Sequence, residues 1–277
     1  MSEQSEKNGG ILIRQEQELA KKFISGLELE YYKDSKLVCL TKENAAKIGA
    51  RILLNPRYEK TVDKTNTESA KHFIEELKKD KSLYKKKTIE SIIRRINSEN
   101  STRMSRIEME KIAKKIIKNA STLKEMKDML KKKDYPLIDI IAKSIKVKTK
   151  DKEDKEGKER NRVNFSFATK FCHYMCFYLF EGRIWQDFYS IYDNIVINVL
   201  PDYAIFFGTK YALKPFNKSK IEKPSDYYRE YQKCIGDILK KNGNKISRNA
   251  FDHIMWYYTK TRKDGETEES NNDQTDE

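Results

Sequence analysis

Residues 164–180 read NFSFATKFCHYMCFYLF and form the most apolar stretch of the chain. Lys170 is the one fully charged residue within it, although 36% of the whole sequence is charged. Lysine is seldom buried without a partner, because removing an ammonium group from water is expensive. Burial favours the neutral amine, which is the form of lysine that acts as a nucleophile. We therefore interpret Lys170 as a candidate reactive group on a helix over 165–180.

The spacing of two tyrosines strengthens this interpretation. In a helix over 165–180, Lys170, Tyr174 and Tyr178 lie on one face, since they are four residues apart. An amine beside two aromatic rings suits a site that stacks a flat base and attacks its sugar. The alternative is a core helix whose lysine extends its ammonium into water from one end.

An acidic residue in a comparable setting follows at Asp193, in FYSIYDNIVINVL (188–200). It precedes an apolar run, so we predict that it caps the helix that begins there. A carboxylate at this place accepts backbone N–H bonds and feels the positive end of the helix, and both effects keep it ionised. A purely structural cap remains the alternative. The pair Lys170 and Asp193 is the predicted reactive centre.

The rest of the chain is predicted to be mainly α-helical, with at most one short strand near 37–40. Thr122 and Glu125 form a capping-box pair at the start of one helix. Helical periodicity and caps predict helices near 42–54, 67–79, 86–97, 105–119, 122–133, 225–241 and, after the cap Ser247, up to Lys260.

The composition predicts five segments along the chain. Residues 146–162, KVKTKDKEDKEGKERNR, have no apolar residue after Val147, which is typical of a solvated linker or loop. The other expected segments are a flexible leader at 1–10, a helical N-terminal region at 11–145, a helical region with the reactive pair at 163–263, and an acidic disordered tail at 264–277.

The charge balance indicates a polyanionic partner. Lys and Arg number 57 against 43 Asp and Glu, a net charge of +14. The tail after Lys263 holds seven acids and no base, so the body before it carries +21, which is 14 plus 7. Nucleic acid is the first candidate for a partner of such a surface. Charge that serves only solubility is the alternative.

The four cysteines form no CxxC pair. Cys172 and Cys176 lie one helical turn apart beside His173, but no second pair of ligands has a suitable spacing, so we expect buried thiols rather than a metal site. The first ten residues are polar, and no apolar run reaches the ~20 residues that span a bilayer. We expect a soluble protein of the reducing cytoplasm that does not bind a membrane.

The segments FSFATKFCHYMCFY (165–178) and YSIYDNIV (189–196) together resemble the active-site segment of helix–hairpin–helix DNA glycosylases of the 8-oxoguanine type. In that family a threonine–lysine pair opens a helix, and a catalytic aspartate caps the next helix. Thr169-Lys170 and Tyr192-Asp193 correspond to these two elements. The resemblance covers roughly residues 163–200.

The resemblance implies a helical fold with two subdomains and a monomer that acts on double-stranded DNA without a metal or cofactor. It implies that a damaged or modified base is flipped out and excised, with Asp193 stabilising charge on the deoxyribose. Lys170 then attacks C1′ and forms a Schiff base, with or without strand scission. An 8-oxoguanine-like base for repair, or a hypermodified phage base in antiviral defence, are both open. The implied base pocket is formed by Tyr174, Tyr178, His253, Trp256 and Tyr257.

The chain departs from this family in two places. The glycine-rich hairpin Leu-Pro-Gly-Val-Gly is absent, and residues 163–168 stand in its place. The spacing from lysine to aspartate is also longer, through GRIWQDF (182–188). From position and charge, we expect the lost contacts to DNA phosphates to be made by Lys158, Arg160, Arg162 and Asn164.

Two other functions remain open on the sequence. Arg248 and His253 have the R-x4-H spacing of HEPN-type ribonucleases, in which both residues act at a dimer interface. A non-enzymatic reading is a basic helical protein that contacts phosphates without base specificity. Its phosphate contacts would come from three clusters, Lys85-Lys86-Lys87, Arg94-Arg95 and Lys131-Lys132-Lys133.

Overall fold

The computed structural model describes residues 9–20, 28–53, 69–100, 102–143, 145–148, 159–210, 213–217 and 221–257. Within these ranges the chain is mainly α-helical, as the sequence predicts. The elements in chain order are α2 (Gly9–Ala20), α3 (Lys42–Leu53), α5 (Ala70–Lys79), η1 (Lys81–Leu83), α6 (Lys86–Glu99), α7 (Arg106–Asn119), α8 (Leu123–Leu130), α9 (Pro136–Ala142), β1 (Ile145–Lys148), β2 (Glu159–Arg162), α10 (Phe165–Leu179), η2 (Ile184–Asp187), α11 (Asn194–Phe206) and α12 (Pro224–Lys241). Residues 248–257 form a further helix.

The helices predicted from periodicity are confirmed, and so is the capping box of Thr122 and Glu125. Two helices were missed. The first, α9, is short and begins with Pro136 directly after a left-handed Tyr135 (φ 52°), so it has too few turns to show periodicity. The second, α2, starts inside the expected leader.

Helix α2 begins at Gly9, and Gly10 within it makes a close packing contact. A Cβ atom at Gly10 would lie 2.6 Å from the carbonyl oxygen of Arg183, so only glycine permits this approach of two backbones. Two adjacent glycines are typical of a loop, so the start of this helix is not marked in the sequence. The expected leader therefore ends before Gly9; its other residues, 1–8, lie outside the described ranges, as do residues 264–277 of the expected acidic tail.

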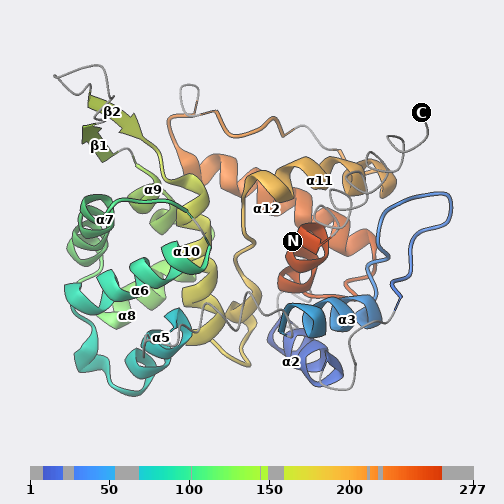
Figure 1. The fold of residues 1–277 in the computed structure, drawn as a ribbon, viewed down its shortest axis with the longest axis horizontal. Helices are drawn as coiled ribbons and strands as arrows, with labels where there is room; N and C mark the ends of the chain where they lie inside the picture. The colour runs from blue at the N-terminus through green and yellow to red at the C-terminus, as the bar shows by residue number, and fades with distance from the viewer. Residues whose placement is uncertain are drawn as a thin grey trace, which may run out of the picture.

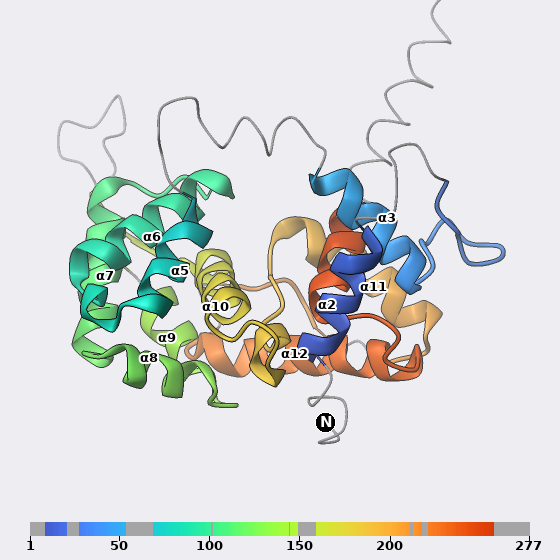
Figure 2. The ribbon, with the colours of Figure 1, turned by 90° about the horizontal axis from the view of Figure 1, so that it is seen from below.

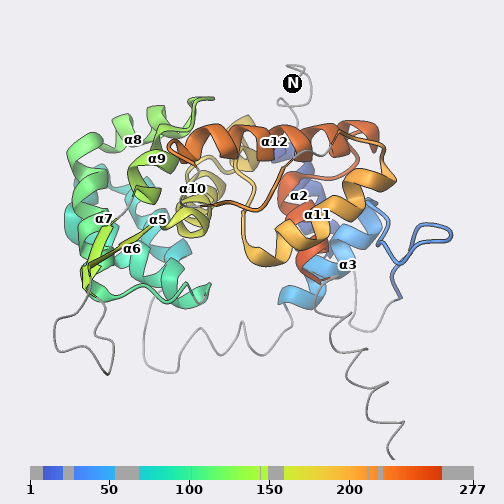
Figure 3. The same ribbon diagram turned by 90° about the horizontal axis from the view of Figure 1, so that it is seen from above.

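The described helices form two lobes (Figure 1). One lobe contains α5 to α9 with α10 packed against α5, α6 and α9. The other contains α2, α3, α11 and residues 248–257, so the first helices of the chain lie with the last ones (Figure 2). Helix α12 runs along both lobes and contacts α9 and α11 (Figure 3).

Hydrogen bonds join the N-terminal segment to the C-terminal lobe. The hydroxyl of Tyr203 donates to the carbonyl of Val38 at 3.0 Å, and the amide of Asn242 donates to the carbonyl of Leu40 at 2.8 Å. The spatial division therefore differs from the division of the sequence at 146–162. Residues 37–40 form no strand, but Val38 makes a single β-bridge with Tyr31.

Strands β1 and β2 form an antiparallel hairpin from the two ends of the charged segment 146–162. Ile145 pairs with Arg162 and Lys148 with Glu159. The sequence predicted a linker or loop here, and the described ends of the segment correct that expectation. Pairing of strands uses the backbone, so a run of charged side chains does not exclude it. Residues 149–158 lie outside the described ranges.

A buried carboxylate fastens α2 to the last helix. Glu16 is 7% exposed, and its two oxygens accept hydrogen bonds from the backbone N–H (2.7 Å) and the hydroxyl (2.5 Å) of Ser247. Burial raises the pKa of Glu16 to about 7; the charge of Asp187 adds to the effect, while the bonds from Ser247 and the charge of Lys42 oppose it. The folded chain therefore favours protonated Glu16.

This shift predicts a pH-dependent contribution to stability. A carboxyl group that binds its proton more tightly in the folded state makes the free energy of unfolding fall as pH rises from its unfolded pKa to its folded pKa. For Glu16 that window runs from 4.5 to about 7. We expect the difference in unfolding free energy between wild type and Glu16→Gln to fall by an amount on the order of 3 kcal/mol across it. Urea unfolding at several pH values measures this difference, and a constant difference would refute the assignment.

No helix within the described ranges is both long and apolar enough to cross a bilayer.

Candidate active site

Lys170 and Asp193 meet between α10 and α11. The Nζ atom of Lys170 lies 3.4 Å from Oδ2 of Asp193. The side chains of Lys170 and Asp193 are 10% and 18% exposed, so protein covers most of their surface and solvent reaches a small part of each. The sequence predicted that these two groups would be neighbours, and the distance confirms it. At this separation, an amine and a carboxylate can both contact the same substrate atom.

The two oxygens of Asp193 have different partners. Oδ1 accepts the backbone N–H groups of Ile195 and Val196, each at 3.0 Å, and so caps α11 as predicted. Oδ2 faces the ammonium of Lys170. The cap fixes the rotamer of Asp193, and the second oxygen is thereby held toward α10. The structural role and the proposed chemical role thus fall on different atoms of one side chain.

Thr169 ties the two elements of the site together. Its hydroxyl donates to the carbonyl of Ser166 at 2.9 Å and accepts the backbone N–H of Tyr192 at 3.0 Å. Thr169 is fully buried, so neither bond is exchanged with water. The residue before the lysine therefore binds the residue before the aspartate. This hydrogen bond holds the segment before Asp193 close to Lys170.

The segment 189–192, which leads to Asp193, is buried and held through its backbone. Four side chains hold it: His173 contacts the carbonyl of Tyr189 (2.7 Å), Tyr228 donates to that of Ser190 (2.7 Å), Tyr231 donates to that of Ile191 (2.5 Å), and Asp252 accepts the N–H of Ile191 (2.8 Å). These residues come from α10, α12 and the last helix. Reasoning from the sequence missed their positioning role, because their partners are backbone atoms distant in the sequence.

Replacing Thr169 by valine tests this positioning. Valine keeps the shape but leaves the buried N–H of Tyr192 without its acceptor, which costs about 1–3 kcal/mol. Thr169→Ser keeps the hydroxyl and serves as the matched control. We expect Thr169→Val to lose more unfolding free energy in urea than Thr169→Ser. Equal losses would show that the methyl group, and not the hydrogen bond, matters here.

The surroundings of the pair include a second acid, Asp252. Burial raises its pKa well above the usual range, and the charges of Asp187 and Asp193 add to this, while the N–H of Ile191 opposes it. Asp252 therefore favours its protonated form.

The tyrosines of the predicted base pocket continue the face of Lys170 along α10. Tyr174 and Tyr178 are half-buried, with ring centroids 6.1 Å apart and an interplanar angle of 62°. The amide of Asn100 donates to the hydroxyl of Tyr174 at 3.2 Å. Burial raises the pKa of Tyr178, so its hydroxyl stays neutral. Both rings are thus fixed against the α5–α9 lobe.

The C-terminal residues predicted for the same pocket diverge. His253 is half-buried and near His173 of α10; burial lowers its pKa to about 4, and the charge of His173 adds to this. Tyr257 instead contacts Arg51 of α3, whose guanidinium bonds its hydroxyl and lies 5.2 Å from its ring centroid. Trp256 is half-buried on the same helix. His253 is thus placed near α10, and Tyr257 is placed against α3.

The predicted phosphate contacts need one correction. Asn164 is 5% exposed, because the start of α10 packs against α9 and the backbone N–H of Asn164 bonds Ala142 at 3.3 Å. It is therefore not a surface contact for DNA. Arg160 and Arg162 lie in β2, and Lys158 lies outside the described residues.

Within one chain, the two residues of the ribonuclease pattern have different surroundings. Arg248 donates to the carbonyl and side-chain oxygens of Gln232 in α12 (3.3 and 2.8 Å). Five residues on a helix separate two side chains by about 140° of rotation, so His253 points elsewhere. Its low pKa also leaves it neutral at pH 7.

The cysteines near the site are structural. Cys172 and Cys176 are fully buried thiols, and burial raises the pKa of both well above the usual range. Among the residues that the structure describes, no group of three or more His, Cys, Asp and Glu side chains could hold a metal ion.

One comparison with known proteins gave a match. A family model described as HI_0787_N, an N-terminal domain, matches residues 53–177, which is less than half of the 277 residues. The matched range contains α5 to α9 and Lys170 of α10, and it ends before Asp193. The searches of curated proteins and of solved structures each gave no match. The chain thus shares with that family model the lobe that carries the lysine.

Proposed function

We propose that this protein is a DNA glycosylase that uses Lys170 as nucleophile and Asp193 as the stabilising carboxylate. The observation that carries the proposal is the 3.4 Å contact between these two shielded groups, on two helices joined by Thr169. It agrees with the resemblance of residues 163–200 to 8-oxoguanine-type glycosylases. The basic body of the chain, at +21 without its last fourteen residues, supports double-stranded DNA as partner.

The reaction begins when the target nucleotide leaves the duplex, which costs a few kcal/mol. Entry of the base beside Tyr174 and Tyr178 excludes water from the pair. The amine nitrogen forms a bond to C1′ while the bond from C1′ to the base breaks. The base leaves with that electron pair and takes up the proton that the nitrogen releases.

Asp193 acts while the positive charge develops on the deoxyribose. Its Oδ2 is fixed by the cap at Oδ1 and needs no rearrangement to face that charge. Opening of the sugar ring then gives a Schiff base between Lys170 and C1′. Loss of a proton from C2′ and departure of the 3′ phosphate give strand scission if the enzyme is also a lyase. None of these steps uses a metal or an organic cofactor.

A panel of duplexes, each with one modified base, tests the proposal. The panel includes 8-oxoguanine and DNA from phages with hypermodified bases, and the readouts are released base by mass spectrometry and a borohydride-trapped adduct. Release of one base supports the proposal and identifies the substrate. Binding without release or adduct on any substrate indicates a non-enzymatic binder, and RNA cleavage that requires His253 indicates a ribonuclease.

A further inference from the structure

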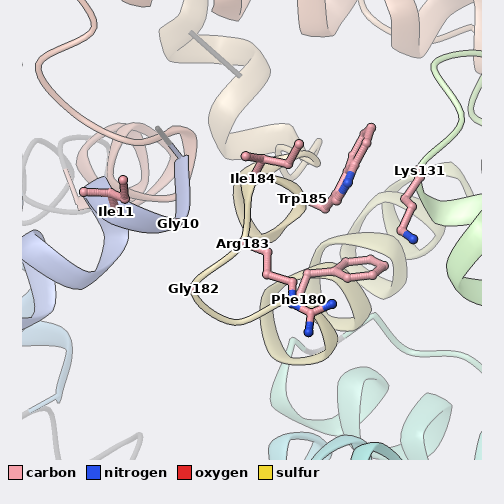
Figure 4. A pocket seen from close by; sticks show the side chains of 8 residues that line it. All are labelled: Gly10, Ile11, Lys131, Phe180, Gly182, Arg183, Ile184 and Trp185. Carbon is pink, nitrogen blue, oxygen red and sulfur yellow. The ribbon is translucent and has the colours of Figure 1, made fainter. Parts of the chain in front are cut away.

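A cavity of about 350 Å³ lies at the C-terminal end of α10 (Figure 4). Phe180 lies ten residues beyond Lys170, about 15 Å along a helix axis, so this cavity is separate from the reactive pair. Its lining includes Ile11, Lys131, Phe180, Arg183, Ile184 and Trp185. Aromatic and aliphatic surfaces therefore adjoin two cations.

The aromatic surfaces are fixed in place. Trp185 packs its ring against the edge of Phe188, with centroids 5.0 Å apart and an interplanar angle of 74°. Phe188 in turn packs against Tyr135 at 5.6 Å. Phe180 is 2% exposed, and the ammonium of Lys131 lies 5.5 Å from its ring centroid. The ring of Trp185 therefore loses little freedom when a flat molecule stacks on it.

The rim of the cavity is also held firmly. The N–H of Gly182 donates to the side chain of Gln186, and the N–H of Arg183 donates to the carbonyl of Phe180, both at 2.8 Å. Gly182 has φ +70°, which glycine adopts without strain. Helix α2 closes one side through the tight contact of Gly10 with Arg183.

Positive charge is concentrated around this cavity. The pKa of Lys127, one turn before Lys131, is lowered by burial and by four neighbouring cations, Lys81, Arg183, Lys131 and Lys78. Cations gathered at this density repel one another unless an anion lies among them.

The recorded acidic partners of this cluster are few and exposed. Glu181 binds Lys78 at 3.1 Å, and Asp128 approaches Lys131 at 3.9 Å. Exposed pairs of this kind neutralise little charge. Arg183 is exposed and has no recorded ion pair within the described ranges.

We propose that this cavity binds a nucleotide, with the base against Trp185 and the phosphate held by Lys131 and Arg183. A flat apolar face beside fixed cations recognises a molecule that is itself flat at one end and anionic at the other. The cavity volume lies in the range of small-molecule sites. The ligand is either a free nucleoside phosphate or an unpaired nucleotide of a DNA strand, which share this chemistry.

Calorimetric titration of the full chain tests the site and distinguishes a free nucleoside phosphate from a nucleotide of a DNA strand as its ligand. The probes are ATP, a six-residue oligothymidylate, adenosine and pyrophosphate. We expect ATP or the oligonucleotide to bind at least ten times more tightly than adenosine or pyrophosphate. The better of the two identifies the source. Binding of pyrophosphate as tight as ATP would show a general anion site and overturn the proposal.

Variants locate the binding. Trp185→Leu and the pair Lys131→Ala with Arg183→Ala should each weaken nucleotide binding at least tenfold, while Lys118→Ala, an exposed lysine of α7, should not. Thermal unfolding confirms that the variants are folded. Unchanged binding in folded variants refutes the site. Because no modified base or excision is measured, this result stands apart from the outcome for the glycosylase proposal.

Discussion

Lys170→Gln abolishes the borohydride-trapped adduct between the protein and its substrate duplex, while the Kd for that duplex changes by less than about threefold, or about 0.7 kcal/mol. Glutamine has nearly the length of lysine but no nucleophilic amine, so no Schiff base forms. The side chain is 10% exposed and offers little surface to the DNA phosphates. Gel separation of trapped complexes and fluorescence anisotropy measure the two quantities.

A matched control removes a lysine without touching the site. Lys118→Gln, at the exposed end of α7, takes away the same charge and should keep the full adduct yield. Lys170→Gln should also remain folded, because Asp193 keeps both backbone bonds of its cap. Adduct formation by folded Lys170→Gln at the wild-type rate would mean that another amine is the nucleophile.

The pair of Lys170 and Asp193 could be predicted from the sequence, because the residues around each of them are distinctive. Lys170 stands alone in an apolar helix, and Asp193 stands before an apolar run, where a cap is expected. A third residue, Thr169, holds the two segments together, because its hydroxyl accepts the backbone N–H of Tyr192, 23 positions later in the sequence. A resemblance over a short segment was therefore enough to predict a spatial neighbour.

The residues that hold the site in place could not be recognised in the sequence. Asp252 lies 61 positions from Ile191, the residue it holds. On the sequence it looks like one of several polar residues in an amphipathic helix. Tyr228 and Tyr231 likewise bind carbonyl groups about 40 residues away, and periodicity predicts only that they face a core. Contacts between a side chain and distant backbone have no sequence pattern.

The arrangement of the lobes was missed for a similar reason. Periodicity predicts that a helix has an apolar face but not which helix covers it. The charged segment 146–162 suggested a boundary, yet Glu16 and Asn242 join the two ends of the chain into one lobe. The close contact at Gly10 could not be predicted, because glycine occurs both in flexible segments and where two backbones pack tightly.

Asp193→Asn should separate the two functions of this carboxylate. Asparagine caps helices about as well as aspartate, so Oδ1 still accepts the N–H groups of Ile195 and Val196. We expect the unfolding free energy to stay within about 0.5 kcal/mol of wild type, whereas Asp193→Ala loses about 1 kcal/mol with the cap. Urea unfolding of the two variants measures this difference.

The chemical effect of Asp193→Asn should depend on the substrate. With a duplex that still carries its modified base, charge develops on the sugar, and an amide in place of Oδ2 slows single-turnover excision by about 10²–10³-fold. With an abasic site no base has to leave, and the amine of Lys170 is still present to attack C1′. Schiff-base formation there should be retained. If excision and Schiff-base formation slow by the same factor in a folded variant, Asp193 only positions the lysine. If neither slows, it is only a helix cap.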